Sequence, residues 1–322
     1  MTASAGACST PGNAVASAPS GPASSPEGAP ASATESSTPA PTTTTPAPTS
    51  SGPSTTKPRP AGAATPPPGR FPGPANTGIP AGTAIRSTVG DYTAGTAGMV
   101  IDGWHVQGSL IVKAANVTIK NSLIDDSVWN EGGSFTIIDT TVGPASCGGP
   151  TIQPDGVGEQ NYTAVRVRIR GHEDGFRASG PGVVIRDSYY LACVRNGEAH
   201  ADGVQDYPAT QNIIIEHNTF DMGNLTNGFT APIFVHATGT SGARIVNNLA
   251  IGGVFSLFLR PARGPWVVTG NRVVEGKYVY SPFETENSCG TVTTWADNDV
   301  VKVDPSYNVV ATVRDDVACG AT

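Results

Sequence analysis

The sequence of 322 residues predicts an all-β domain, wound as a solenoid of short strands, that follows a long low-complexity N-terminal segment. Residues 1–75 contain 17 of the 28 prolines and only five charged residues, which leaves too few apolar side chains for a core. From residue 99 onward, a short apolar strand pattern recurs every 18 to 30 residues. No stretch of this region has the 3.6-residue apolar period of an amphipathic helix. Repeated short strands without helices are typical of a β solenoid.

Residues 1–75 are expected to form a disordered tether, because their Pro, Thr, Ser and Ala runs combine extended stiffness with good solvation. Residues 5–9 (AGACS) resemble the end of a bacterial lipoprotein signal, which makes Cys8 a candidate lipid anchor. An incidental cysteine is the alternative. No run of about 18 apolar residues occurs, so no transmembrane span is predicted.

Residues 76–322 are expected to form one domain with a continuous core. They carry 16 basic and 24 acidic residues. A net negative field disfavours nucleic acid as the main partner, although a local basic patch could still bind an anionic sugar. A monomer is expected, with other oligomeric states left open.

Four cysteines lie in the domain, and their even number favours two disulfide bonds in an exported protein. Of the three pairings, Cys147–Cys193 and Cys289–Cys319 are favoured, because each pair is close in sequence and the second would hold the C-terminus. Free buried thiols are the alternative. The absence of CxxC and HxxxH spacings argues against zinc.

The recurring strand pattern fixes the architecture. Its copies cover residues 116–124, 134–142, 163–170, 182–190, 212–220, 244–251 and 267–274. The equivalent inward positions are predicted to be Ile119, Ile137, Val165, Ile185, Ile215, Ile245 and Val268. Each coil alone would expose an apolar face, and stacking buries all of these faces in one column. Asn and Asp at the strand ends suit left-handed turns between sheets.

A second strand is predicted in each coil, within residues 174–177, 202–205, 232–236, 255–260 and 279–283. Strand alternation predicts that Phe176, Val204, Ile233 and Leu257 point inward. Their neighbours Arg177, Gln205, Phe234 and Ser256 are then expected to point outward. His236 and Arg260 are expected further along the same outer face.

This whole pattern, over about residues 99–300, resembles the right-handed parallel β-helix, or pectin-lyase-like, superfamily. The resemblance implies a single-stranded right-handed parallel β-helix and a polysaccharide-facing role. Residues 202–206 (DGVQD) are similar to part of the Asn-Thr-Asp-Gly-x-Asp segment of polygalacturonase-type hydrolases, but His200 and Ala201 replace Asn and Thr. Residues 260–263 (RPAR) are distantly similar to the Arg-x-Pro-x-x-Arg signature of pectate lyases. Neither match supplies a complete catalytic set.

The densest polar clusters are residues 171–177 and 198–206, which share the spacing His-x-Asp-Gly. Adjacent coils lie about 4.8 Å apart, so the two clusters should stack. His172 is then expected over His200, Asp174 over Asp202, and Arg177 over Gln205. The predicted catalytic residues are His172, Asp174, Arg177, His200 and Asp202. The predicted substrate-binding residues are Glu173, Gln205, Asp206, Tyr207, His236 and Arg260.

The leading reaction is β-elimination from a uronate-containing polysaccharide, in which a cation neutralises the substrate carboxylate while a base and an acid move protons. Arg177 or Arg260 is the candidate cation, and His200 is the candidate base. Tyr207 or His172 is the candidate acid.

Glycoside hydrolysis is the next candidate, and it would use a pair of carboxylates from Glu173, Asp174, Asp202 and Asp206. Epimerisation at C5 would use the same His, Tyr and Arg side chains as the lyase. A non-catalytic adhesin is the alternative from another class, in which the two histidines stabilise turns.

The protein is expected to be secreted or tethered at the cell surface. No cofactor is predicted with certainty. Calcium is left open, with Asp125 and Asp126 as candidate ligands against a solvated loop.

Overall fold

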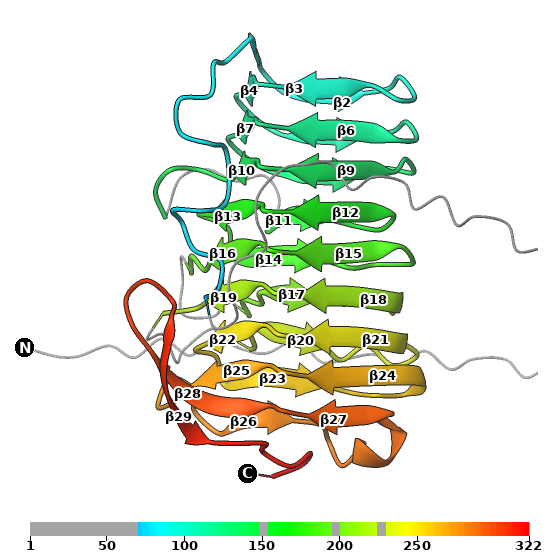
Figure 1. Ribbon diagram of the computed structural model, residues 1–322. Coiled ribbons are helices and arrows are strands. Elements are labelled where there is room, and N and C mark those ends of the chain that lie inside the picture. The colour runs from blue at the N-terminus through cyan, green and yellow to red at the C-terminus, as the bar shows by residue number, and fades with distance from the viewer. Residues whose placement is uncertain (1–69, 148–153, 195–199, 224–229, 322) are drawn as a thin grey trace, which may run out of the picture. The chain divides into compact units, whose positions relative to one another are not determined.

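The protein is a parallel β-helix, as predicted. The computed structural model describes residues 70–147, 154–194, 200–223 and 230–321, so Cys8 and most of the predicted tether lie outside the described residues. The chain winds through stacked coils, and successive strands pass to three different sheets in turn (Figure 1). Parallel pairing holds between neighbouring coils throughout the described residues, and only β28 and β29 pair antiparallel there.

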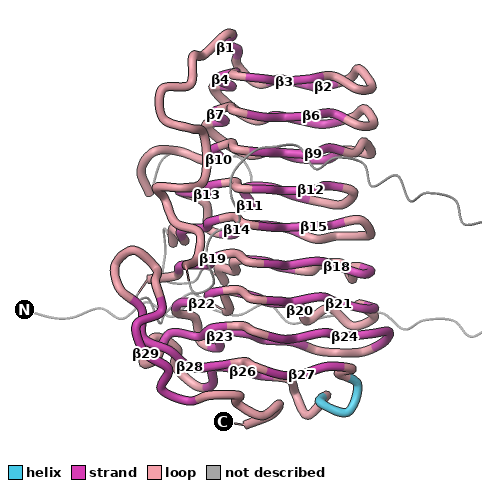
Figure 2. Tube along the Cα trace, in the orientation of Figure 1, coloured by secondary structure: helices cyan, strands magenta, loops and turns pink. Residues whose placement is uncertain are grey.

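Each sheet takes every third strand of the chain until the last coil. Sheet 1 contains β1 (Ser87–Val89), β4 (Trp104–Val106), β7 (Leu123–Ile124), β10 (Thr141–Val142), β13 (Arg168–Arg170), β16 (Tyr189–Leu191), β19 (Thr219–Asp221), β22 (Leu249–Ile251), β25 (Arg272–Val274), β28 (Asp299–Val303) and β29 (Val309–Arg314). Sheet 2 contains β2 (Tyr92–Ala94), β5 (Leu110–Val112), β8 (Val128–Asn130), β11 (Asp155–Gly158), β14 (Asp174–Arg177), β17 (Val204–Gln205), β20 (Ile233–Val235), β23 (Phe255–Leu259) and β26 (Ser281–Glu284). Sheet 3 contains β3 (Val100–Asp102), β6 (Val117–Lys120), β9 (Phe135–Ile138), β12 (Tyr162–Val165), β15 (Val183–Arg186), β18 (Gln211–Glu216), β21 (Ser241–Val246), β24 (Arg263–Thr269) and β27 (Thr294–Ala296). A short 3-10 helix, η1 (Cys289–Thr291), follows β26 (Figure 2).

The core is a column of apolar side chains inside the three sheets, as the strand repeat predicts. One predicted member of the column is wrong by one residue. Ala164, and not Val165, pairs with Ile137 above and Ile185 below. A one-residue shift moves a side chain to the other face of a strand, so Val165 lies on the outer face and is half-buried.

Asparagines between sheet 3 and sheet 1 form a buried ladder along the solenoid. Asn218 Nδ2 donates to Asn248 Oδ1 at 3.0 Å, Asn248 donates to Asn271 at 3.0 Å, and Asn271 donates to Asn298 at 2.9 Å. Each of these four side chains is fully buried. The residue that precedes a ladder asparagine lies in the turn and has a positive φ, for example His217 (54°) before Asn218 and Asn247 (54°) before Asn248. The expected left-handed turns with Asn are therefore present.

The N-terminal part of the described chain, residues 70–86, is a strap that runs along sheet 1 before the first coil begins (Figure 1). Arg70 forms an isolated bridge with Asn308, and the Gly78 N–H donates to the Arg166 carbonyl at 2.8 Å. Phe71 is buried in a small apolar cluster beside sheet 1. The folded part therefore includes residues that precede the predicted boundary at residue 76.

Both predicted disulfide bonds are present. Cys147 is bonded to Cys193, and Cys289 is bonded to Cys319. No helix among the described residues is long and apolar enough to cross a membrane.

Candidate functional site

The outer face of sheet 2 carries the side chains that form the candidate site. Strand pairing places Arg177 beside Gln205, Gln205 beside Phe234, Phe234 beside Phe258, and Phe258 beside Glu284. The predicted stacking of Arg177 on Gln205 is therefore confirmed. We call these five residues the outer ladder.

A second column lies two residues further along each coil and consists of Tyr207, His236, Arg260 and Glu286, which we call the terminal column. All four residues lie just beyond the ends of β17, β20, β23 and β26, and Glu286 has a positive φ of 46°, so strand alternation does not extend to them. Side-chain contacts bring His236, Arg260 and Glu286 together, and Tyr207 holds the corresponding place after β17. Glu286 joins its neighbours: Arg260 Nε donates to Glu286 Oε2 at 2.5 Å, and His236 Nε2 lies 3.2 Å from Glu286 Oε1. The predicted residues His236 and Arg260 are thus brought together through a carboxylate.

The terminal column is open to solvent. Tyr207 is 67% exposed, and the side chains of His236, Arg260 and Glu286 are partly exposed. Hydrogen bonding to Arg260 holds the pKa of Glu286 below its usual range, so this side chain is a carboxylate at neutral pH. Arg260 uses one of its five N–H donors here, which leaves the others for a ligand.

An aromatic shelf borders the terminal column. The Phe234 ring stacks on His236 with ring centres 4.8 Å apart, and Phe258 meets His236 edge-on at 4.6 Å. Phe255 packs against Phe258 at 4.9 Å and against Tyr280 at 5.6 Å. Tyr280 is 71% exposed. Phe234, Phe255 and Phe258 are half-buried. Aromatic faces that reach solvent, above all that of Tyr280, can stack on sugar rings.

Asp206 supports the terminal column from beneath and is buried. Its Oδ1 accepts the backbone N–H groups of His236 at 2.6 Å and Ala237 at 2.9 Å, while its Oδ2 accepts the Thr240 hydroxyl at 2.5 Å. Burial raises the pKa of Asp206, and these hydrogen bonds oppose that rise. Asp206 therefore positions the His236 backbone and does not itself face solvent.

Asp174 and Asp202 stack as predicted, but inside the wall of the solenoid. They are 8% and 1% exposed, and they continue a column that begins at Asp155. Asp202 Oδ2 accepts Gln205 Nε2 at 3.1 Å. Burial raises the pKa of all three carboxyl groups, to about 6 for Asp155. Groups held in this way are shielded from a polysaccharide.

Arg177 lies beside this column and is already paired with acids. Its Nη1 is 3.5 Å from Asp155 Oδ2, and its Nε is 3.5 Å from Glu159 Oε1. Its Nε also donates to the Ser179 hydroxyl at 3.2 Å. Arg177 therefore has a structural role, because its positive charge offsets the negative charge of the buried Asp155 carboxylate.

The two predicted histidines do not share one environment. His172 is fully buried, and its Nε2 lies 3.0 Å from the backbone carbonyl of Asp126. His200 is exposed. Glu173, the neighbour of His172 in the first cluster, is half-buried, and its carbonyl accepts the Tyr190 hydroxyl. The equal spacing of the two motifs correctly predicts that their aspartates stack. It does not predict that His172 is buried while His200 is exposed.

Ser256 lies on the same face of β23 as Phe258, two residues away, but it is buried there and donates to the Gly252 carbonyl at 3.0 Å. Phe258, and not Ser256, pairs with Phe234. Glu286 and Asp155 are candidate functional-site residues that were not predicted from the sequence. The spacing of 26 residues from Phe258 to Glu284, extended by two, would have placed Glu286 beside Arg260.

The calcium candidates Asp125 and Asp126 have protein partners. Asp125 Oδ2 lies 2.9 Å from His105 Nε2, and Asp126 Oδ2 accepts the Ser109 hydroxyl at 2.7 Å. Within the described ranges, no three His, Cys, Asp or Glu side chains converge as a metal-binding group.

No protein family, curated protein or solved structure matches this chain.

Proposed function

We propose that the protein acts on an extracellular polysaccharide at the outer face of sheet 2, with the terminal column as its reactive group. The observation that carries this proposal is the hydrogen-bonded set His236, Glu286 and Arg260 at the edge of the aromatic shelf. Sugar rings would stack on the shelf, and the charged set would face the reacting bond.

β-Elimination from a uronate is the reaction that these groups support best. The free N–H donors of Arg260 would bind the substrate carboxylate and make the adjacent C–H more acidic. Glu286 accepts from His236 Nε2, which leaves Nδ1 to take the proton. The exposed hydroxyl of Tyr207 would protonate the leaving oxygen. The hypothesis from the sequence gave the role of base to His200, whereas this proposal gives it to His236.

The test is incubation of the full chain with uronate-containing and neutral polysaccharides, with and without calcium. Elimination leaves a conjugated unsaturated sugar, so both ultraviolet absorbance and reducing ends should rise. His236→Gln should lower the rate by about a hundredfold or more. His105→Gln is the matched control, because His105 also pairs with a carboxylate but lies on sheet 1. Equal rates for the two variants would refute the role of His236, and reducing ends without absorbance would identify a hydrolase.

Non-catalytic polysaccharide binding is the second candidate. It is favoured by the burial of Asp174 and Asp202, which removes the predicted carboxylates from the surface. Binding that Phe258→Ala weakens, with no product from any polysaccharide, would establish it.

The fold and the exposed shelf also support membership of the pectin-lyase-like superfamily. The two disulfide bonds support an extracellular location. Lipid attachment at Cys8 stays a prediction, and labelling of the intact protein with a radioactive fatty acid, compared with Cys8→Ser, would test it.

A further inference from the structure

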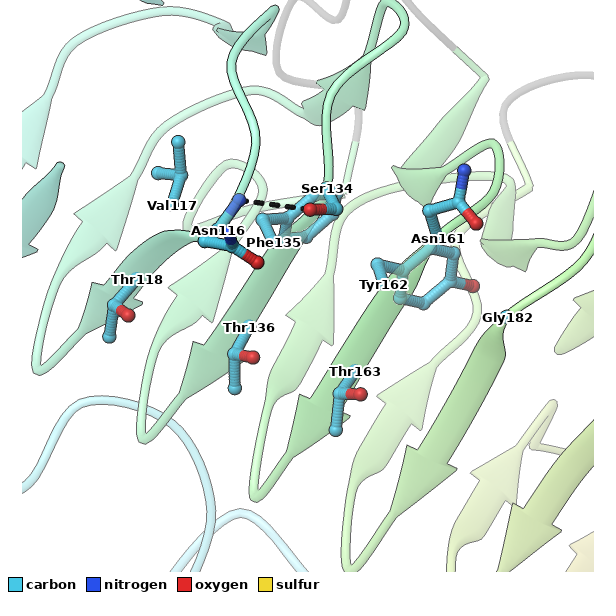
Figure 3. A pocket seen from close by; sticks show the side chains of 10 residues that line it. All are labelled: Asn116, Val117, Thr118, Ser134, Phe135, Thr136, Asn161, Tyr162, Thr163 and Gly182. Carbon is cyan, nitrogen blue, oxygen red and sulfur yellow. Dashed lines mark hydrogen bonds between the residues drawn. The ribbon is translucent and has the colours of Figure 1, made fainter. Parts of the chain in front are cut away.

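A polar groove lies on the outer face of sheet 3, away from the candidate site. It encloses about 380 Å³, which is within the range of small-ligand sites. Its walls come from β6, β9 and β12 and from the turns that lead into these strands (Figure 3).

The groove presents two columns of uncharged polar side chains. Thr118, Thr136 and Thr163 pair in register across the three strands. Two residues earlier in each coil stand Asn116, Ser134 and Asn161, on the same face (Figure 3). The pattern repeats with the coil spacing, about 4.8 Å.

Part of the groove is ordered before any ligand arrives. Asn116 and Asn161 have positive φ values of 60° and 53°, and the Asn116 N–H donates to the Ser134 hydroxyl at 2.9 Å. Threonine in a strand has few χ1 rotamers. Little side-chain entropy would therefore be lost on binding.

The ends of the groove are also defined. Val100 precedes the threonine column and is 54% exposed, and Val184 follows it. Gly182 keeps the lower end open: its φ is +74°, and a Cβ there would lie 3.0 Å from Asn161 Oδ1.

The chemistry of the lining selects the ligand. Among the residues that the structure describes, no charged side chain lines the groove, so an ionic ligand finds no counter-charge there. An apolar ligand would leave the hydroxyl and amide groups desolvated and unpaired. A ligand rich in hydroxyl groups can exchange its hydrogen bonds with water for bonds to these side chains. The regular spacing suits a chain whose units repeat at about 5 Å.

We infer that this groove is a second binding site, specific for an uncharged, extended polysaccharide chain that lies along the solenoid axis. It shares no residue with the terminal column, so it does not depend on the function proposed above.

The test is calorimetric titration of the full chain carrying Phe258→Ala, which disables the aromatic shelf. The probes are hexamers of β-1,4-linked glucose, mannose and N-acetylglucosamine, with a galacturonate hexamer for comparison. At least one neutral hexamer should bind, and Thr136→Arg should weaken that binding by about tenfold or more. Thr136→Val, which keeps the shape and removes the hydroxyl, should weaken it by about two- to tenfold.

Thr269→Arg is the matched control, since Thr269 is a half-buried residue of sheet 3 in β24, outside the groove. Its affinity should equal that of the parent. The inference is overturned if no neutral hexamer binds at millimolar concentration, if galacturonate binds as tightly and is weakened equally by Thr136→Arg, or if Thr136→Arg and Thr269→Arg bind alike.

Discussion

Asp174 Oδ1 accepts the backbone N–H of Asp202 at 2.7 Å, and this bond links two coils inside the wall of the solenoid. Asp202 Oδ1 repeats the arrangement with the N–H of Ala231 at 3.0 Å. A ladder of inward carboxyl groups thus supports the strands that carry the outer ladder. This ladder also makes the stability of the protein depend on pH.

The first prediction concerns Asp155, at the start of that column. Burial raises its pKa from 3.8 to about 6, so the unfolded chain loses this proton at lower pH than the folded protein. Stability should therefore fall as pH rises from about 4 to about 6, by up to about 3 kcal/mol from this group. Asp155→Asn should flatten the dependence of Tm on pH over this window. Asp315→Asn, at an exposed position, should leave the slope unchanged, and an unchanged slope for Asp155→Asn would contradict the assignment.

A second prediction concerns the asparagine ladder. Asn248 Nδ2 donates to Asn271 and to the Ile215 carbonyl, and its Oδ1 accepts from Asn218. Asn248→Ala would remove the side-chain acceptor of the Asn218 backbone N–H and the side-chain donor to Asn271 and to the Ile215 carbonyl, all of them buried, and we expect a loss of about 2–4 kcal/mol in urea unfolding. Asn298→Ala interrupts the ladder at one junction and should cost less. Equal losses would show that the ladder does not act as a continuous network.

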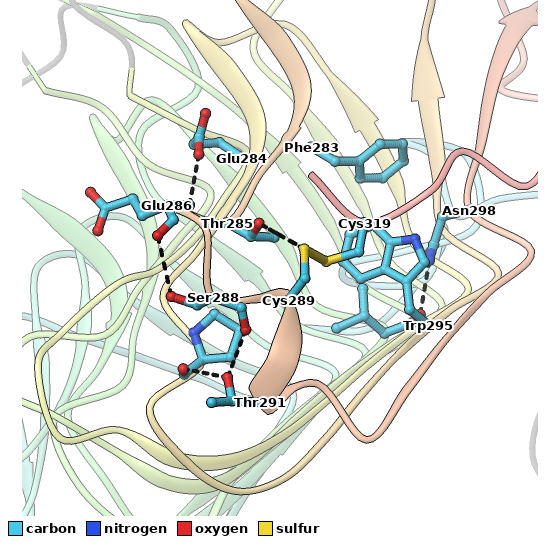
Figure 4. The surroundings of a disulfide bond; sticks show 12 residues. Phe283, Glu284, Thr285, Glu286, Ser288, Cys289, Thr291, Trp295, Asn298 and Cys319 are labelled. Atoms are coloured by element: carbon cyan, nitrogen blue, oxygen red, sulfur yellow. Dashed lines mark hydrogen bonds between the residues drawn. A yellow bond between two sulfur atoms is a disulfide. The ribbon is translucent and has the colours of Figure 1, made fainter. Parts of the chain in front are cut away.

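The third prediction concerns the disulfide that holds the C-terminus. Cys319 is bonded to Cys289, and Trp295 Nε1 donates to the Val317 carbonyl at 2.7 Å (Figure 4). Serine at both cysteine positions should cost up to about 4 kcal/mol and shift tryptophan fluorescence to the red as the C-terminal segment leaves Trp295. The double serine variant of Cys147 and Cys193 should destabilise without that shift in the folded state. A red shift in both variants would argue for general loosening.

His217 is the subject of the fourth prediction, because it fastens the strap. Its Nδ1 lies 2.7 Å from Asp187 Oδ1, its Nε2 lies 3.1 Å from the Arg70 carbonyl, and its ring stacks on Phe71. His217→Ala should speed tryptic cleavage after Arg70 by about tenfold, because cleavage follows the population of the detached strap. His105→Ala should cleave like the parent. No acceleration in His217→Ala would mean that other contacts hold the strap.

The fifth prediction concerns the pairing of Arg260 with Glu286. The Arg260 hydrogen bond is the main cause of the lowered pKa of Glu286. Arg260→Gln should therefore raise the pKa of Glu286 and move the acid limb of the pH–activity profile to higher pH. NMR titration of the Glu286 carboxyl carbon measures the same change without turnover. Arg186→Gln, on sheet 3, should alter neither result.

The sequence by itself determined the coil architecture, because strand alternation and recurring turn residues are local signals that repeat along the chain. It favoured the two disulfide pairings that the structure contains, because the cysteines of each pair are close in sequence, and it predicted the stacking of Arg177 on Gln205 from the equal spacing of the two His-x-Asp-Gly motifs. The tertiary structure decided which polar side chains face solvent. Asp174 and Asp202 sit two residues before inward side chains and are buried with them, whereas His236 and Arg260 meet through Glu286, a residue from a later coil. Because the coils differ in length, the contact with Glu286 could be placed only once the pairing of Phe258 with Glu284 was known.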